Sequence, residues 1–275
     1  MRRSWVVTLV VTALFGLALV GSATADDDPP PLEEVPEAPE TADAAGPQLA
    51  STIGTATGLY PCGDTTKSYC KQKMASLNVG NSVTMRCYHD WKDSTGKSWR
   101  WFYITTSTSP YREGFVHAEV IPRSSQTVVD RCDRSPATTT TGRIHAASWT
   151  LRRIPSTAYD NLCLKFMRDA YLNTWGKDIN TVATNTYSAH TYWSTFTGTK
   201  HTSSDPRFKL PPRGALVFWK GRTGFPEGHV AVSIGNGWLV SSAERSLTGV
   251  HLVTIAQRNA DSALNAVYAG WVMPF

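Results

Sequence analysis

Long apolar segments are almost absent from this 275-residue sequence. The exception is residues 5–20, which follow two arginines and precede a small-residue cleavage pattern, Ala-Thr-Ala, at residues 23–25. Such a run is too short for a comfortable membrane span, so residues 1–25 are predicted to be a secretory signal peptide rather than an anchor helix. We therefore expect a secreted, extracellular or wall-associated protein with no membrane partner after signal cleavage.

Basic and aromatic residues are missing from residues 26–46, which are acidic and rich in Pro and Ala. Such a segment buries too little apolar area to offset its ordering entropy, so residues 26–49 are predicted to be a disordered tail. Residues 44–275 carry 25 Lys and Arg against 14 Asp and Glu, a net charge of +11. That charge suits peptidoglycan or another anionic wall polymer, or only maintains solubility. Because no nucleic-acid motif accompanies it, no nucleic-acid partner is expected.

Cysteine is also sparse, with five residues and no Cys-x-x-Cys spacing. Since His-x-x-x-His spacing is missing too, no zinc, other metal or cofactor is expected. Cys62, Cys70, Cys87 and Cys132 share one segment, where three disulfide pairings are possible in an oxidising compartment. We favour a local Cys62–Cys70 link, which leaves Cys87–Cys132. Cys163 is left over as a reactive thiol or an intermolecular link; of these we favour the thiol, in a monomer.

Strand and turn signals divide the remaining chain into two domains. Residues 50–133 alternate short strand-like stretches with turns such as 93–97, which predicts a small all-β barrel. Residues 134–144 contain Thr, Pro and Gly without apolar periodicity, which is typical of a linker. In residues 145–275 a helix precedes apolar strand-like stretches and an Asn-Gly turn at 235–237, so the predicted class is α+β.

The stretch that organises the second domain is residues 159–171, which has the periodicity of an amphipathic helix. Asp160 and Asn161 are good N-cap residues, and they place Cys163 in the first helical turn. The backbone N–H groups and the helix dipole favour the thiolate there, which is the nucleophilic form. The alternative is a small buried core residue, because a cysteine has no hydrolytic chemistry without a base.

His229 is the candidate base, since it opens a predicted strand directly after Gly228, at a sheet end where side chains can face a cleft. A cysteine and a histidine that are distant in sequence and meet in space form the reactive pair of thiol hydrolases. The imidazole takes the thiol proton, the thiolate attacks a carbonyl, and the imidazolium protonates the leaving amine. The competing interpretation is a histidine with only a structural role in its strand.

Two family resemblances add to this interpretation. Residues 77–80 leading into Val83 and Cys87, with residues 100–102 and 113–116, resemble the bacterial SH3-like domains of secreted wall proteins. That resemblance implies wall or peptide binding. The aromatic ligand candidates are also what a small barrel needs in its core: Trp91, Trp99, Tyr103 and Tyr111.

Asn161-Leu162-Cys163 at a helix start, residues 213–219, and the Gly-His-Val strand and Gly-Asn-Gly turn of residues 228–237 carry the second resemblance. Together they resemble the NlpC/p-sixty and CHAP superfamily of cell-wall cysteine hydrolases. The resemblance implies a papain-like domain and cleavage of amide bonds in peptidoglycan peptides without a cofactor. Cys163 would be the nucleophile and His229 the base.

The chain departs from that family's pattern next to both residues. Leu164 and Lys165 follow the cysteine, where the NlpC-type branch has Ser-Gly, and Ala215 replaces an acidic residue. By position, Ser241 orients the base, although serine is a weak orienter compared with His, Glu or Asn. Glu244 is one alternative to Ser241, and a backbone carbonyl is another.

The oxyanion hole is expected from the backbone N–H of Cys163. Tyr159 either donates its hydroxyl to the same oxygen or packs on the helix start as a hydrophobic staple. The predicted function is a secreted peptidoglycan endopeptidase with a Cys-His thiol mechanism. The alternatives are a non-catalytic or weakly active wall-binding protein on the same fold, and an N-acetylmuramoyl-L-alanine amidase.

Overall fold

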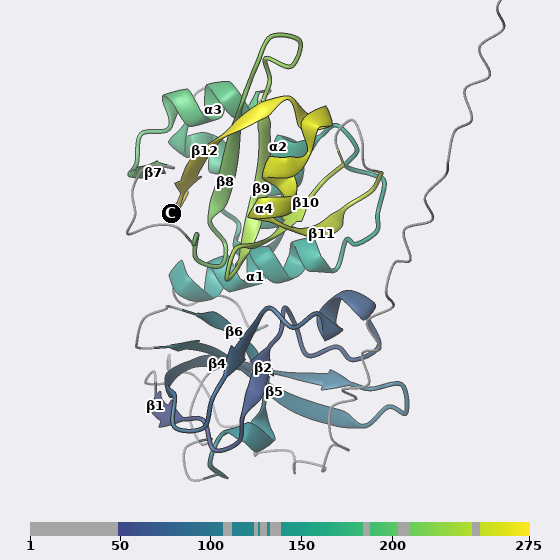
Figure 1. Ribbon diagram of the computed structural model, residues 1–275, viewed down its shortest axis with the longest axis vertical. Helices are drawn as coiled ribbons and strands as arrows, with labels where there is room; N and C mark the ends of the chain where they lie inside the picture. The colour runs from purple at the N-terminus through teal and green to yellow at the C-terminus, as the bar shows by residue number, and fades with distance from the viewer. Residues whose placement is uncertain are drawn as a thin grey trace, which may run out of the picture. The chain divides into compact units, whose positions relative to one another are not determined.

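The computed structural model describes residues 49–106, 112–123, 126, 131–132, 139–183, 188–202, 210–243 and 248–275 (Figure 1). All of these belong to one compact unit. The predicted signal peptide and residues 26–48 of the predicted tail lie outside the described residues, and Leu49 already begins a strand. Among the helices of the described ranges, none is long and apolar enough to span a membrane.

The first part of the unit contains strands and short 3-10 helices, as predicted for an all-β segment. Its described strands form an antiparallel sheet in the order β1-β4-β5-β6 and a separate β2–β3 pair. Their bounds are β1 (Leu49–Thr52), β2 (Thr57–Leu59), β3 (Ala75–Leu77), β4 (Ser82–Lys92), β5 (Ser98–Thr106) and β6 (Glu113–His117). Val83, Met85 and Cys87 are buried on β4 with partly exposed residues between them, which is the alternation of a strand with one face on a core.

Both favoured disulfides are present. Cys62 pairs with Cys70 and Cys87 pairs with Cys132, which confirms the local link and the longer one. Cys163 takes part in neither disulfide and is buried. The one cysteine thiol of the described residues therefore lies in the second part of the unit, at the position predicted for the nucleophile.

The aromatic residues of the first part serve mainly as core. Trp99 and Tyr103 are buried, and the ring of Trp91 packs edge-on against that of Phe115 with centroids 5.0 Å apart. Tyr111 lies outside the described residues. The first part of the unit thus uses these rings mainly to fill its interior.

The second part of the unit is a six-stranded antiparallel sheet in the order β11-β10-β9-β8-β12-β7 with helices packed on it (Figure 1). The strands are β7 (Lys200–Thr202), β8 (Leu216–Gly221), β9 (His229–Gly235), β10 (Trp238–Ser241), β11 (His251–Thr254) and β12 (Ala266–Val272). The helices are α1 (Thr139–Leu151), α2 (Cys163–Trp175), α3 (Ala189–Thr195) and α4 (Ile255–Ala260). This is the mixed helix and antiparallel-sheet class that the sequence predicts.

Strand periodicity divides the buried side chains of this sheet between two apolar clusters. On β8, Leu216 and Phe218 join the cluster that contains residues of α1, α2 and α3. Val217 and Trp219, which alternate with them, join a second cluster packed against Ile255 of α4. Covering on both faces explains why β8 is a continuous apolar run in the sequence rather than an alternating one.

The predicted linker over residues 134–144 needs correction, because α1 begins at Thr139 and runs through its second half. Threonine is a poor helix former, so the sequence carries little local helix signal here. Tertiary packing stabilises this helix where its intrinsic helix propensity is low. Ala146, Ala147 and Trp149 are buried in the cluster that α1 shares with α2. A Cβ at Gly142 would lie 2.3 Å from the ring of Trp175, so this helix face sits directly on the end of α2.

Buried polar contacts connect the first part of the unit to the second. The side chain of Asn236, in the predicted Gly-Asn-Gly turn, hydrogen-bonds both the N–H and the carbonyl of Glu113 on β6. The buried Glu113 carboxylate accepts from the backbone N–H of Arg213 and from the hydroxyl of Tyr103. The buried Arg213 guanidinium donates to the Pro61 carbonyl at 3.2 Å. The first part of the unit is therefore joined to the second by buried hydrogen bonds.

Candidate active site

The start of α2 places Cys163 at the first helical position. The N-cap residue is Leu162, with no side-chain cap, and not Asp160 or Asn161 as predicted. The prediction of a first-turn cysteine still holds, because the helix begins at Cys163 itself. A helix provides no internal acceptor for its first N–H groups, so the backbone at this position suits a developing negative charge.

The two residues predicted as caps instead fix the loop that leads into α2. The N–H of Asn161 donates to the carbonyl of Ala243 at 2.9 Å, with Asn161 in the left-handed region at φ 58°. The carboxylate of Asp160 accepts from the N–H of Gly249 at 2.9 Å. The β10–β11 connection thus holds the helix start from two points, and this locates Cys163 relative to the sheet.

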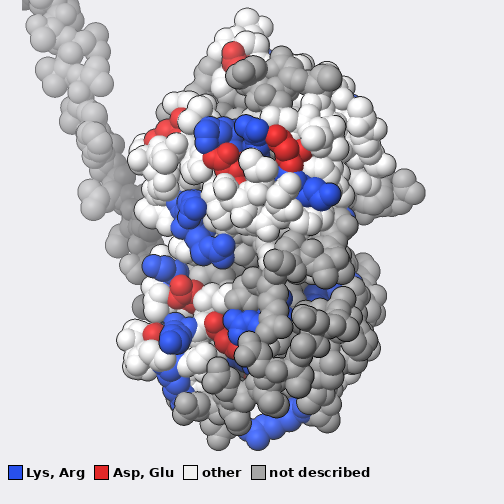
Figure 2. All heavy atoms as spheres, turned by 180° about the vertical axis from the view of Figure 1, so that it is seen from behind, with Lys and Arg blue, Asp and Glu red and all other residues white. Residues whose placement is uncertain are grey.

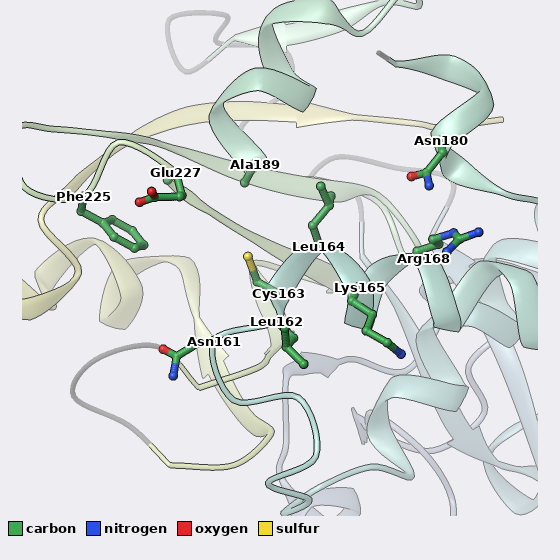
Figure 3. Close-up of a pocket in the computed structure, with 11 residues that line it drawn as sticks. Asn161, Leu162, Cys163, Leu164, Lys165, Arg168, Asn180, Ala189, Phe225 and Glu227 are labelled. Atoms are coloured by element: carbon green, nitrogen blue, oxygen red, sulfur yellow. The ribbon is translucent and has the colours of Figure 1, made fainter. Parts of the chain in front are cut away.

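A pocket of about 530 Å³ opens at this helix start (Figure 3). Figure 3 shows the sulfur of Cys163 projecting toward the wall that carries Phe225 and Glu227, with Lys165 and Arg168 on the other side. The lining combines apolar, amide and charged side chains of both signs: Asn161, Leu162, Cys163, Leu164, Lys165, Arg168, Asn180, Ala189, Phe225, Glu227 and Gly228. Such a lining suits a peptide-like ligand with apolar, amide and charged groups.

The basic side of the pocket is held in place by acidic neighbours. Lys165 pairs with Asp169 one turn along α2, and this hydrogen bond raises the pKa of Lys165. Arg168 donates to both oxygens of Asp178, with Nη2 at 2.9 Å from Oδ2. The Arg168 hydrogen bonds lower the pKa of Asp178. Both cations therefore stay charged and oriented at the rim of the pocket.

His229 is fully buried at the first position of β9, as the strand prediction required. The preceding residue, Gly228, lines the same pocket as Cys163, and α2 packs on β9. Gly228 has φ 67°, and a Cβ there would lie 2.4 Å from the carbonyl oxygen of Trp219. Only glycine lets the chain enter the strand at this point, so Gly228 sets where the imidazole stands.

Ser241 lies against the base, at the place predicted for the orienting group. Its Oγ is 2.8 Å from Nε2 of His229 across the β9–β10 pair. The Ser241 hydroxyl also lies 3.1 Å from the carbonyl of Ser242, to which it donates. With its proton used there, Oγ is placed to accept from an Nε2–H group. Glu244, the alternative orienter, lies outside the described residues.

A second group at Nε2 was not foreseen from the sequence. Nη2 of Arg258, on α4, lies 3.2 Å from Nε2 of His229, and Nη1 of the same guanidinium pairs with Asp261 at 2.9 Å. Arg258 is only 1% exposed. A single arginine in a weakly patterned six-residue helix carries no motif, and only the fold brings it to the histidine.

Tyr159 has a packing role in this structure rather than the oxyanion role considered above. Its hydroxyl donates to Asp169 at 3.0 Å, and its ring packs on those of Phe166 and Trp149. Burial, and then the hydrogen bond to Asp169, raise the pKa of Tyr159. Since Tyr159 is not among the residues that line the pocket, the staple alternative describes it better.

No group of three or more His, Cys, Asp or Glu side chains that could hold a metal ion occurs within the described ranges. The reactive groups in this region are the thiol of Cys163 in the pocket and the imidazole of His229 with its polar neighbour Ser241.

Comparison with known proteins finds several similar solved structures. No protein-family model and no curated protein matches the sequence. Three of the similar structures are NlpC1 of Trichomonas vaginalis (11% identity, 82% of this chain and 70% of that one, TM-score 0.33), NlpC2 of the same organism (12%, 82% and 73%, 0.33) and an NlpC/P60 family protein of Bacillus cereus (12%, 82% and 64%, 0.31). At these values we base the chemistry on the geometry of the chain itself.

Proposed function

We propose that this protein is an exported thiol hydrolase that cleaves amide bonds in wall peptides as an endopeptidase. The observation that carries the proposal is the 2.8 Å contact between Ser241 Oγ and Nε2 of His229, a buried histidine directly after Gly228, which lines the pocket of Cys163. Nε2 lies against Ser241 on the neighbouring strand, and in this proposal the thiol proton passes to Nδ1. A nucleophile, a base and an orienting group are thereby supplied by three separate elements, as thiol hydrolysis needs.

The proposed reaction has two stages. His229 accepts the Cys163 proton at Nδ1, and the sulfur bonds to the amide carbonyl carbon, whose oxygen becomes negative near the start of α2. The carbon–nitrogen bond then breaks, the imidazolium gives its proton to the leaving amine, and a thioester remains on Cys163. Water, deprotonated by His229, cleaves the thioester to a carboxylate and restores the thiol.

Compartment and substrate class are argued from disulfides, charge and the pocket lining. Two disulfides suit an oxidising compartment. Residues 44–275 carry a net charge of +11, and Figure 2 shows Lys and Arg at several places on one face, some beside acidic residues. A basic exported protein with a peptide-like pocket fits an anionic wall polymer that carries peptides. We further propose that residues 50–133 contribute wall binding as a part of the same unit.

The test is digestion of purified wall sacculi, followed by mass spectrometry of the released fragments. The wild type should release peptides with new amino and carboxyl ends, and Cys163→Ala should release none. His89→Ala, altered on β4 within the first part of the unit, serves as a folded control that should match the wild type. Equal release by wild type and Cys163→Ala would refute the thiol mechanism. Fragments cut between sugar and peptide would show an amidase in place of an endopeptidase.

A second candidate function is a weakly active or non-catalytic wall-binding protein. It is favoured by the neutral serine at the orienting position and by the cation of Arg258 beside the same nitrogen, since neither stabilises an imidazolium. Under this alternative, wild type and Cys163→Ala would both sediment with sacculi and release no fragments. The two functions are thus separated by the same digestion.

A further inference from the structure

The Nε2 atom of His229 faces Ser241, which can donate or accept a hydrogen bond, and Arg258, which can only donate. Ser241 Oγ, whose own proton goes to the Ser242 carbonyl, can accept from Nε2–H at 2.8 Å. The Arg258 guanidinium, 3.2 Å from the same atom, can only donate and is always charged. A proton on Nε2 can therefore be accepted by the serine but opposes the arginine, whereas a bare Nε2 can accept from either.

The charged imidazolium is the state that Arg258 opposes most. The neutral tautomer with a bare Nε2 can accept from both neighbours, whereas the imidazolium puts both a proton on Nε2 and a full positive charge 3.2 Å from a guanidinium. Like charges at this separation disfavour the charged form, and burial of both groups reduces screening by solvent. A resting thiolate–imidazolium pair, which many thiol hydrolases hold, is therefore destabilised in this site.

Arg258 is held beside Nε2 of His229 by its own contacts and by those of α4. Its charge is balanced on the far side by Asp261, at 2.9 Å from Nη1. α4 is anchored by a capping box between Thr254 and Gln257, and by a 2.7 Å hydrogen bond from the indole N–H of Trp219 to Asn259. These contacts hold the helix that carries Arg258 in place beside the sheet.

The charge of Arg258 also acts on a neighbouring histidine, His251. Burial lowers the pKa of His251 on β11, and the charge of Arg258 also lowers it, against the Gly249 carbonyl hydrogen bond and the carboxylates of Asp261 and Asp160. The arginine thus acts on a second imidazole of the same sheet region.

We propose that Arg258 is a positioning residue that keeps His229 uncharged at rest, so that Cys163 rests as a thiol and loses its proton only as it attacks. The proposal rests on the proposed pairing of Cys163 with His229. Charged and titratable groups of the described residues near Cys163 or His229 include Arg258 on α4, Asp261 after it, His251 on β11, Glu227 before β9, Asp160 before α2, and Lys165 and Arg168 on α2.

The experiment measures the rate at which iodoacetamide alkylates Cys163 in the intact protein between pH 4 and 9, by mass spectrometry. Arg258→Met removes the cation and keeps the length, so the imidazolium becomes easier to form and thiolate appears at lower pH. We expect the alkylation profile to move down by roughly one pH unit or more. Arg258→Lys keeps the charge and should retain the wild-type profile, which a purely structural role for the arginine would not allow.

Asp261→Asn gives a second variant, since it leaves the arginine in place and removes its counter-charge. Its profile should move to higher pH, opposite to Arg258→Met. Unchanged profiles in Arg258→Met and Asp261→Asn, or equal shifts in Arg258→Met and Arg258→Lys, would overturn the proposal. Because alkylation needs no substrate, these results stand apart from the sacculus digestion. A failed digestion with shifted profiles would refute only the hydrolase function.

Discussion

At the residue scale, the group proposed to orient His229 is a neutral serine, Ser241, and not a carboxylate. Ser241 has one hydroxyl, which donates a hydrogen bond to the carbonyl of Ser242. It can therefore hold the ring of His229 through Nε2–H without supplying the negative charge that a carboxylate would give to an imidazolium. The contribution of Ser241 to turnover should be that of one neutral hydrogen bond.

Ser241→Ala should therefore lower kcat/KM on a purified wall peptide by about 2- to 10-fold, which corresponds to a neutral hydrogen bond of about 0.5–1.5 kcal/mol. Glu244→Gln, which removes a charge three residues later, is the comparison. A loss larger for Glu244→Gln than for Ser241→Ala would make Glu244 the orienter, with the upper limb of the pH–rate profile at lower pH. Equal and small losses would leave that role to a backbone carbonyl or water.

At the element scale, the site depends on two helices whose starts differ. α2 begins at Cys163 with no side-chain cap and is located by its loop contacts to Ala243 and Gly249. α4 is only six residues long, and its capping box between Thr254 and Gln257 satisfies backbone groups that so short a helix leaves exposed. The first helix carries the proposed nucleophile, and the second carries the arginine at the base.

Thr254→Ala should lower the free energy of unfolding by about 1 kcal/mol, because it removes the cap of α4. Thr254→Ser keeps the capping oxygen and should cost less. Guanidinium unfolding, followed by tryptophan fluorescence, measures both variants. Equal losses for alanine and serine would mean that the methyl group, and not the cap, is what matters at this position.

Elements with strong local patterns could be predicted from the sequence, and elements made by packing could not. The apolar run of β8, the Gly-His-Val start of β9 and the Asn-Gly turn each carry a signal within a few residues. α1 has a threonine-rich start and is helical because it packs on α2. Cys163, His229 and Ser241 were located through such local signals, whereas Arg258 reaches the base only through the fold.

At the scale of the whole molecule, the all-β segment and the sheet domain are parts of one compact unit. Residues expected to form a separate binding module share a buried polar interface with the second part of the unit through Glu113, Asn236 and Arg213. The disulfide-bonded residues Cys62 and Cys70 also join the apolar cluster of α1 and α2. The two parts should therefore unfold together.

Glu113→Gln should lower the free energy of unfolding by roughly 1–3 kcal/mol, since one of two buried donors loses its acceptor. Glu119→Gln, at an exposed residue of the same segment, should change it by less than about 0.5 kcal/mol. One cooperative transition is expected, seen at the same midpoint by tryptophan fluorescence and by alkylation of Cys163. Two transitions at different denaturant concentrations would show independent domains.

The most direct measurement of the central claim is kcat/KM for His229→Ala on one purified wall peptide, beside wild type and His89→Ala. If His229 is the base for Cys163, the first variant should lose roughly 10²- to 10⁴-fold, as expected when general base catalysis is removed, while retaining its fold by circular dichroism. His89→Ala should stay within about twofold of wild type on this peptide, since the half-buried His89 lies on β4 and not on the elements that carry Cys163 and His229. Near-wild-type turnover by a folded His229→Ala would contradict the account.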